Sequence, residues 1–320
     1  MLRVYEATEG HDCGTPLAER RRLRHRVAMR GTWPVVGALL VLATGCGDAS
    51  STPAETRATY DGPVVRPTAV PAAAGSVVSS RPVTVTDDGS GPRLCFSDVT
   101  WGGGLPDPLV CDDAAVAGWD WERDGGEFTE EKGVRMGFYR LVGSFDGSTF
   151  TVESATQPDP EPPAFDFEIP CPTPEGGWQV LDRGLVTQDD LFATTSVAQA
   201  LDDFATVAVS TPDGEPGPRD PANTVVSVNV AGDPAAAEAA IREVWGGMLC
   251  VTRVERTEKE MLALQQQTLD VPGFVQSGAG SPTNQLEITV FHDDGRIQQW
   301  MDHEHGEGVV VVESILQPVG

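Results

Sequence analysis

The sequence predicts an α+β protein, in which a small all-β, barrel-like domain is followed by an α/β layered domain of the ferredoxin-like plait type. Three observations support this fold class. Residues 82–156 show strand-like alternation of apolar and polar side chains and almost no helical periodicity. Residues 165–320 alternate between strand-like runs and helical runs that begin at capping residues. A proline-rich run, QPDPEPPA at 157–164, forms a stiff connector between the two parts.

The chain opens with a leader and a signal. Residues 1–28 are polar and arginine-rich, and we expect them to be upstream sequence ahead of a true start at Met29. An unusually long, positively charged n-region is the alternative. Residues 29–45 have the pattern of a secretory signal peptide, with Arg30 followed by an apolar run and small residues. That run of about ten residues makes ~15 Å of helix, which is short for a hydrocarbon core of roughly 30 Å.

The end of this signal, Ala43-Thr44-Gly45-Cys46, resembles the lipobox of bacterial lipoproteins. The resemblance implies that Cys46 receives a diacylglycerol with palmitate-type chains and becomes the first residue of the mature protein. Two acyl chains give stable anchoring, so the implied location is the extracytoplasmic face of the cell membrane. An ordinary cleaved signal with an incidental cysteine is the alternative. The use of 20 arginines against two lysines suits a GC-rich, actinobacterial genome.

The mature chain is strongly acidic. Without residues 1–45 it keeps 15 basic and 44 acidic residues. Such a chain repels phosphate backbones and anionic headgroups, which argues against nucleic acid as a partner and leaves the Cys46 lipid as the membrane contact. Residues 46–81 are rich in Ser, Thr, Pro and Ala and predict a flexible tether that reaches some 30 Å.

Four further cysteines belong to the folded part. An even number in an exported chain predicts disulfides, and the connector at 157–164 favours the pairs Cys95–Cys111 and Cys171–Cys250. A zinc site is the rival interpretation, but no CxxC pair is present.

The β domain, residues 82–156, is expected to hold five or six strands. An OB-like barrel is one possibility, and any small barrel or sandwich is another. Phe145-Asp146-Gly147 predicts the turn of a hairpin. The expected strands are residues 83–86, 93–97, 119–121, 134–142 and 148–154.

The α/β domain, residues 165–320, alternates strands with capped helices. Thr187, Asp233 and Thr257 are the expected helix caps, and Pro234 suits a first helical position. Helices are expected at 191–201, 233–245, 257–268 and 295–303, and strands at 204–210, 224–230, 249–254, 285–292 and 309–315.

An acidic loop has nearly the spacing of a calcium-binding loop. Side-chain oxygens would come from Asp120, Glu122, Asp124 and Glu131, with Gly125 at the sharp turn. The glutamate at the third position and the strand-like flanks depart from that motif. An acidic hairpin loop without calcium is the alternative, and no other cofactor is implied.

The densest titratable cluster lies near the C-terminus and contains His292, His303 and His305 among several carboxylates. Imidazole and carboxylate groups are plausible ligands for a divalent metal ion. His303 and His305 are two residues apart, however, and do not share a helix face. A solvated acidic helix end is the alternative interpretation.

No GxSxG, HExxH or SxxK motif is present, and we do not expect an enzyme. The sequence instead predicts a membrane-anchored extracytoplasmic lipoprotein with a non-catalytic binding or interaction role at the cell surface, where a protein is a candidate partner. One alternative is a metal-dependent or hydrolytic enzyme with a site between the domains. Another is a modulator of secreted proteases, because residues 284–317, with a strand, then a helix, then Gly-Glu-Gly-Val-Val-Val, look similar to the α/β pro-regions of secreted bacterial proteases.

Overall fold

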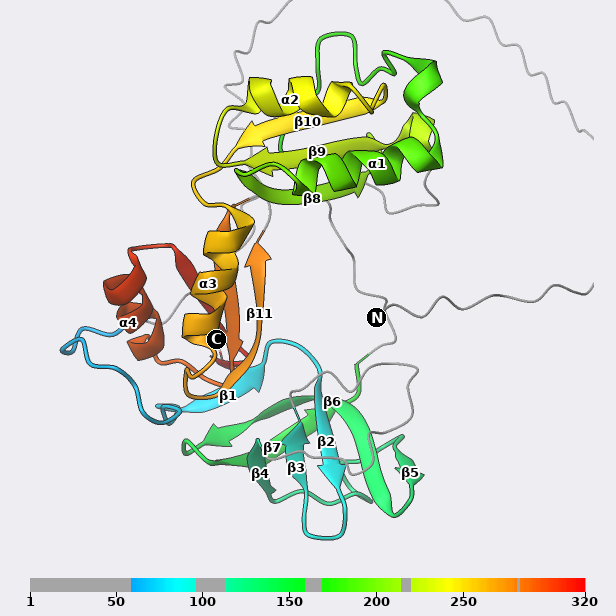
Figure 1. Cartoon of the computed structure of the whole chain (residues 1–320). Helices are drawn as coiled ribbons and strands as arrows, with labels where there is room; N and C mark the ends of the chain where they lie inside the picture. Colours follow the sequence, from blue (N-terminus) through cyan, green and yellow to red (C-terminus); the bar gives the residue numbers. More distant parts are fainter. Residues whose placement is uncertain (1–58, 96–112, 159–168, 214–219, 281–282, 320) are drawn as a thin grey trace, which may run out of the picture. The chain divides into compact units, whose positions relative to one another are not determined.

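The computed structural model describes residues 59–95, 113–158, 169–213, 220–280 and 283–319. They form an α+β fold that contains a closed barrel and two further sheets (Figure 1). Within these ranges no helix has both the length and the apolar character needed to cross a membrane. The signal peptide, Cys46 and Cys111 lie outside the described residues.

Five strands close into a barrel. They are β2 (Val83–Asp87), β3 (Arg93–Cys95), β4 (Ala114–Ala117), β6 (Val134–Phe145) and β7 (Thr149–Thr156). The pairing runs β2–β3–β4–β7–β6, and β6 closes the ring by pairing with β2. Only β4 and β7 pair in parallel. The barrel-like domain is therefore confirmed, with the strand order of an OB-like barrel.

The barrel interior is packed with apolar side chains. Leu94, Leu141 and Phe150 are fully buried, as is the ring of Tyr139. The Tyr139 hydroxyl donates a hydrogen bond to the Gly125 carbonyl oxygen at 2.6 Å, which satisfies its polar atom inside the core. Burial raises the pKa of Tyr139 to about 12.

The predicted hairpin joins β6 to β7. The Asp146 carboxylate accepts the backbone N–H groups of Ser148 and Thr149, and these bonds lower its pKa. Gly147 has a φ of 100°, a left-handed conformation that glycine adopts at little cost. The turn is thus fixed by the two residue types that predicted it.

The barrel sheet extends beyond the predicted domain boundaries at both ends. β1 (Ser76–Ser79) lies in the predicted tether, yet it pairs with β6. β14 (Leu316–Pro318), near the C-terminus, pairs with β1 and so belongs to the barrel sheet and not to the α/β domain. Alternation in a stretch as short as Ser76–Ser79 does not reveal a strand, because only its pairing with distant segments stabilises it.

The plait predicted for residues 165–320 differs from the sheets observed there. A plait needs one sheet, whereas the described strands form two three-stranded sheets. We call them the first sheet, β8 (Phe204–Ser210), β9 (Val225–Val230) and β10 (Met248–Arg253), and the second sheet, β11 (Phe274–Gly280), β12 (Gln285–Val290) and β13 (Val310–Ser314). In each, the central strand is antiparallel to its predecessor and parallel to its successor. Strand periodicity does not indicate which strands pair, so the sequence alone does not distinguish a single sheet from two separate sheets.

The two sheets belong to two copies of one αββαβ arrangement. The first repeat, residues 187–253, places α1 (Gln188–Gln199) before β8 and α2 (Pro234–Arg242) between β9 and β10. The second repeat, residues 257–314, places α3 (Glu258–Thr268) before β11 and α4 (Arg296–His305) between β12 and β13. Both therefore have the same element order and the same strand pairing.

Local details of the first helix and first strand match at an offset of 70 residues. Capping boxes open the first helix of each repeat, formed by Thr187 with Asp190 and by Thr257 with Glu260. The first strand of each repeat carries an irregularity directly after its first phenylalanine, Phe204 in one and Phe274 in the other. The matching capping boxes and strand irregularities indicate that the two segments are a structural repeat.

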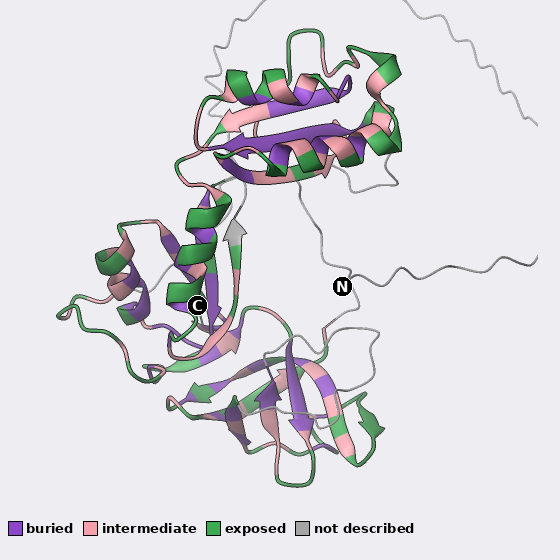
Figure 2. Cartoon of the chain, in the orientation of Figure 1, coloured by how far each residue is buried: buried purple, intermediate pink, exposed green. Residues whose placement is uncertain are grey.

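Each repeat has its own core beneath its helices (Figure 2). Leu191 and Met261 occupy the same place on α1 and α3, and Ile241 and Met301 do so on α2 and α4; all four are buried. The outer faces of the helices are exposed, so the helices cover one face of each sheet.

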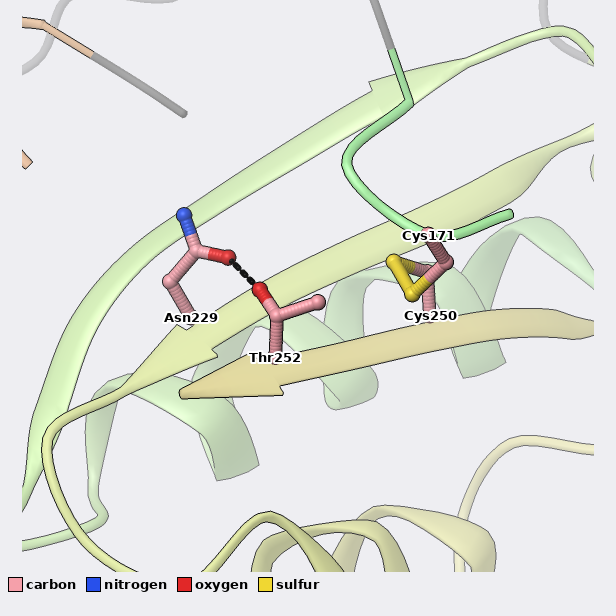
Figure 3. Close-up of a disulfide and its surroundings, with 4 residues drawn as sticks. All are labelled: Cys171, Asn229, Cys250 and Thr252. Atoms are coloured by element: carbon pink, nitrogen blue, oxygen red, sulfur yellow. Dashed lines mark hydrogen bonds between the residues drawn. A yellow bond between two sulfur atoms is a disulfide. The ribbon is translucent and has the colours of Figure 1, made fainter. Parts of the chain in front are cut away.

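A disulfide covers part of the opposite face of the first sheet. The predicted pair Cys171–Cys250 is present, with a Cα–Cα distance of 5.8 Å (Figure 3). It holds Ile169 and Trp178 near Val225 of the central strand in one apolar cluster. Cys95 is also in a disulfide, and its predicted partner Cys111 lies outside the described residues.

Farther along that face, the sheet is held by polar side chains. Asn229 of β9 lies opposite Thr252 of β10, whose hydroxyl donates to the Asn229 side-chain oxygen at 2.5 Å (Figure 3). The Asn229 amide nitrogen donates to the Thr206 hydroxyl at 2.9 Å. These bonds link the side chains of all three strands of the first sheet, so β8 is held to β9 by side-chain as well as backbone bonds.

Candidate binding groove

The predicted calcium loop is held by its own hydrogen bonds. The Asp120 carboxylate accepts the backbone N–H groups of Glu122 at 2.8 Å and Arg123 at 3.2 Å. The Asp124 carboxylate accepts from the Arg123 Nε at 2.8 Å and from the Asp120 N–H at 2.9 Å. Hydrogen bonding by Arg123 lowers the pKa of Asp124. Both carboxylates therefore already have partners within the loop.

The other two predicted ligands lie apart. Glu122 is exposed, and Glu131 ends β5 (Thr129–Glu131), where it pairs with Val134 of β6. The position that supplies a bidentate glutamate in a calcium loop is thus part of a strand. Across the part of the chain that the structure describes, no group of three or more His, Cys, Asp or Glu side chains is placed to hold a metal ion.

The C-terminal histidines are likewise separated. His292, 4% exposed, precedes α4; its Nδ1 lies 2.9 Å from the Leu316 carbonyl oxygen and its ring meets Phe145 edge-on. His303 and His305 lie in the last turn of α4, where His303 Nδ1 is 3.1 Å from the Glu304 carboxylate. The cluster is dense in sequence but is spread along the helix in space.

Asp293, beside His292, positions the start of α4. Its carboxylate accepts the N–H groups of Gly295, Ile297 and Gln298 at 2.9 to 3.1 Å. Burial raises its pKa against the opposing effect of these bonds. Asp233 makes the corresponding bond to Ala235 in the first repeat, which indicates a structural role for both acids.

A groove lies where the two repeats meet, between β8 and α3. Its volume is about 260 Å³. Its apolar lining comes from both repeats and consists of Phe204, Ala205, Val207, Met261, Leu262 and Leu286. Leu262 is 53% exposed, so the groove presents apolar surface that the fold itself does not bury.

The polar lining of the groove is mostly uncharged. It consists of Gln199, Thr206, Gln265 and the carboxylate of Glu258. The Gln265 side-chain nitrogen donates to the Ser277 hydroxyl at 2.8 Å, which orients this amide at the wall. Amide, hydroxyl and apolar groups in such a mixture are suited to recognition of a ligand.

Two sets of hydrogen bonds place α3 against the groove. The capping box fixes the first turn of the helix, because Thr257 accepts the Glu260 N–H and Glu260 accepts the Thr257 N–H at 2.8 Å. Asn284, 8% exposed, holds the segment before the helix: its oxygen accepts the N–H groups of Glu255 and Arg256 and its nitrogen donates to the Arg256 carbonyl oxygen. These bonds therefore fix the start of α3, which lines the groove.

The same helix position in the first repeat lies outside this groove. Phe192 of α1 is the counterpart of Leu262 at the 70-residue offset, and it is 63% exposed. It is absent from the groove lining. The pair Phe192 and Leu262 thus provides a matched comparison between an exposed apolar side chain outside the groove and one inside it.

The sequence prediction did not include the groove. A signal was present, since Thr187-x-x-Asp190-Leu191-Phe192 and Thr257-x-x-Glu260-Met261-Leu262 share one pattern of cap, acid and two apolar residues. No known protein family, curated protein or solved structure matches the chain, so its function must be argued from its own residues.

Proposed function

We propose that this protein is a membrane-anchored extracytoplasmic lipoprotein whose groove between β8 and α3 binds a protein partner without catalysis. The observation that carries the proposal is the groove itself, which is lined from both repeats and contains an exposed apolar side chain, Leu262. Exposed apolar surface rimmed by polar groups is typical of interaction sites.

The size of the groove favours part of a polypeptide over a cofactor. Sites for small molecules commonly measure about 300–1,000 Å³, and this groove is smaller. A volume of that order accommodates one or two side chains of a larger partner. The lining contains a single carboxylate, Glu258, amid apolar and neutral polar groups, which suits binding more than acid–base chemistry.

Two observations support the proposed location. Ala43-Thr44-Gly45-Cys46 resembles a lipobox, and the Cys171–Cys250 disulfide belongs to an oxidising compartment. The predicted tether, residues 46–81, is wrong at its C-terminal end, because Gln299 donates to the Tyr60 carbonyl oxygen and Arg66 pairs with Asp270 in the second repeat.

Site-specific photo-cross-linking on intact cells tests the binding role. A photoreactive amino acid is placed at position 262 in the full-length protein, and in a matched variant at position 192. We expect a discrete cross-linked species from position 262 alone. Equal products from both positions, or none from position 262, would show that the groove does not hold a partner.

A further inference from the structure

We infer that an extended polypeptide segment adds to β8 as a further strand of the first sheet, places one or two of its side chains in the groove and presents a basic side chain to Glu258. This inference rests on the proposed function and names the class of partner.

β8 is an edge strand of its sheet. The strand order is β10–β9–β8, so β9 pairs with one side of β8 and, among the described residues, no strand pairs with the other. Residues 204–207 of β8 line the groove. In an edge strand, alternate backbone N–H and C=O groups point away from the sheet and can pair with another chain. Residues 208–210 continue β8 past the groove lining, so an added strand has a longer run of backbone to follow.

The helix beside this edge gives the site its selectivity. A strand that pairs with β8 directs alternate side chains to opposite faces of the sheet. Side chains on the α3 side meet the apolar groups of Met261 and Leu262. Recognition by strand addition has two components. Backbone hydrogen bonds provide affinity, and a pocket for alternate side chains provides specificity.

The same helix disfavours a second copy of this chain as the occupant. β8 of a second molecule would arrive with its own α3 beside it, because α3 flanks β8 within each chain. Pairing of two β8 strands would then bring two helices to the space that one groove provides. A single extended segment has no such obstruction.

Charge complementarity points to a basic segment. Glu258 is the charged residue in the lining, which includes no lysine or arginine. The whole chain carries a formal net charge of −26, which attracts cationic partners over long range and repels acidic ones. A lysine or arginine near Glu258 would gain an ion pair at the rim, where such pairs chiefly determine association rate and specificity.

The test uses a displayed library of random eight-residue peptides, selected on the full chain in detergent and counter-selected on Leu262→Asp. We expect the selected peptides to be enriched in lysine and arginine and in β-branched residues. Bound peptide should slow hydrogen exchange of β8 amides at least tenfold and leave β11, the matching strand of the second repeat, unchanged. Methylation of alternate peptide nitrogens should weaken binding at least tenfold, and Glu258→Gln should weaken it several-fold.

The outcomes separate this inference from the proposed function. Peptides that bind in a Leu262-dependent manner without protecting β8 amides, or that tolerate methylation at every nitrogen, overturn strand addition and leave the groove as a binding site. A library that yields no Leu262-dependent peptide overturns the peptide as occupant. Selected peptides without basic residues overturn the role of Glu258. The cross-link at position 262 tests the proposed function independently of all three.

Discussion

The Cys171–Cys250 disulfide should stabilise the first repeat and leave the second nearly unchanged. The bond joins residues separated by 79 positions in the sequence. Loop-closure entropy for a loop of that length gives about 4.5 kcal/mol, while measured contributions of single disulfides are typically 2–4 kcal/mol. Replacement of both cysteines by alanine should therefore lower the free energy of unfolding of the first repeat by an amount in this range.

Hydrogen exchange measures this change separately in the two repeats. Buried amides in a central strand exchange through large openings, so their rates report the local unfolding free energy. β9 is buried along its whole length and β12 occupies the same place in the second sheet. Because 1.4 kcal/mol is tenfold in an equilibrium constant, β9 amides should exchange roughly 30- to 2,000-fold faster in the double variant. β12 amides should change little.

Two results would refute this reasoning. Equal acceleration in β9 and β12 would mean that the repeats unfold as one unit, so that the disulfide is not local to the first. A change in β9 below about threefold would mean that the packing of Ile169 and Trp178 against the sheet persists without the bond and constrains the chain equally well.

Three further predictions concern the anchor, the helix caps and a buried acid. Cys46→Ser should abolish incorporation of labelled palmitate and release the protein from membranes, measured by fractionation; retention of label would refute the lipid assignment. Thr187→Ala and Thr257→Ala should each cost about 1 kcal/mol, seen as faster exchange in α1 and α3 respectively, because each removes one capping box. Asp293 has a raised pKa in the folded state, so the folded protein binds its proton more tightly than the unfolded chain does, and stability should fall as pH rises from the ordinary aspartate pKa to the raised value. Asp293→Asn should remove that loss in denaturant titrations at a series of pH values; an unchanged pH dependence would contradict it.

Helices were the part of the fold that the sequence predicted best. Thr187 and Thr257 carry the chemistry of a cap, and Asp233-Pro234 fixes the start of α2, so local residues decide where these helices begin. Strands depend on partners elsewhere. β11, with sequence FVQSGAG, was missed because its small residues give neither alternation nor strong strand propensity.

Pairing and sites were harder to predict for the same reason. The division of the α/β part into two sheets depends on which strands pair, and β14 joins the barrel sheet through β1, which is more than two hundred residues away in sequence. The acidic loop and the histidine cluster are dense in sequence, yet Asp120, Asp124 and Asp293 use their oxygens to hold backbone N–H groups. The groove is lined by β8 and α3, which belong to different repeats, so no single sequence motif predicts it.

The central claim is that the junction of the repeats holds a partner. The most direct test places the photoreactive amino acid at position 199, which lines the groove from the first repeat as Leu262 does from the second, and compares three backgrounds. We predict a cross-linked partner in the otherwise unchanged protein and in Phe192→Asp, and its loss in Leu262→Asp. A partner that persists in Leu262→Asp, or that is lost equally in both variants, would contradict the account.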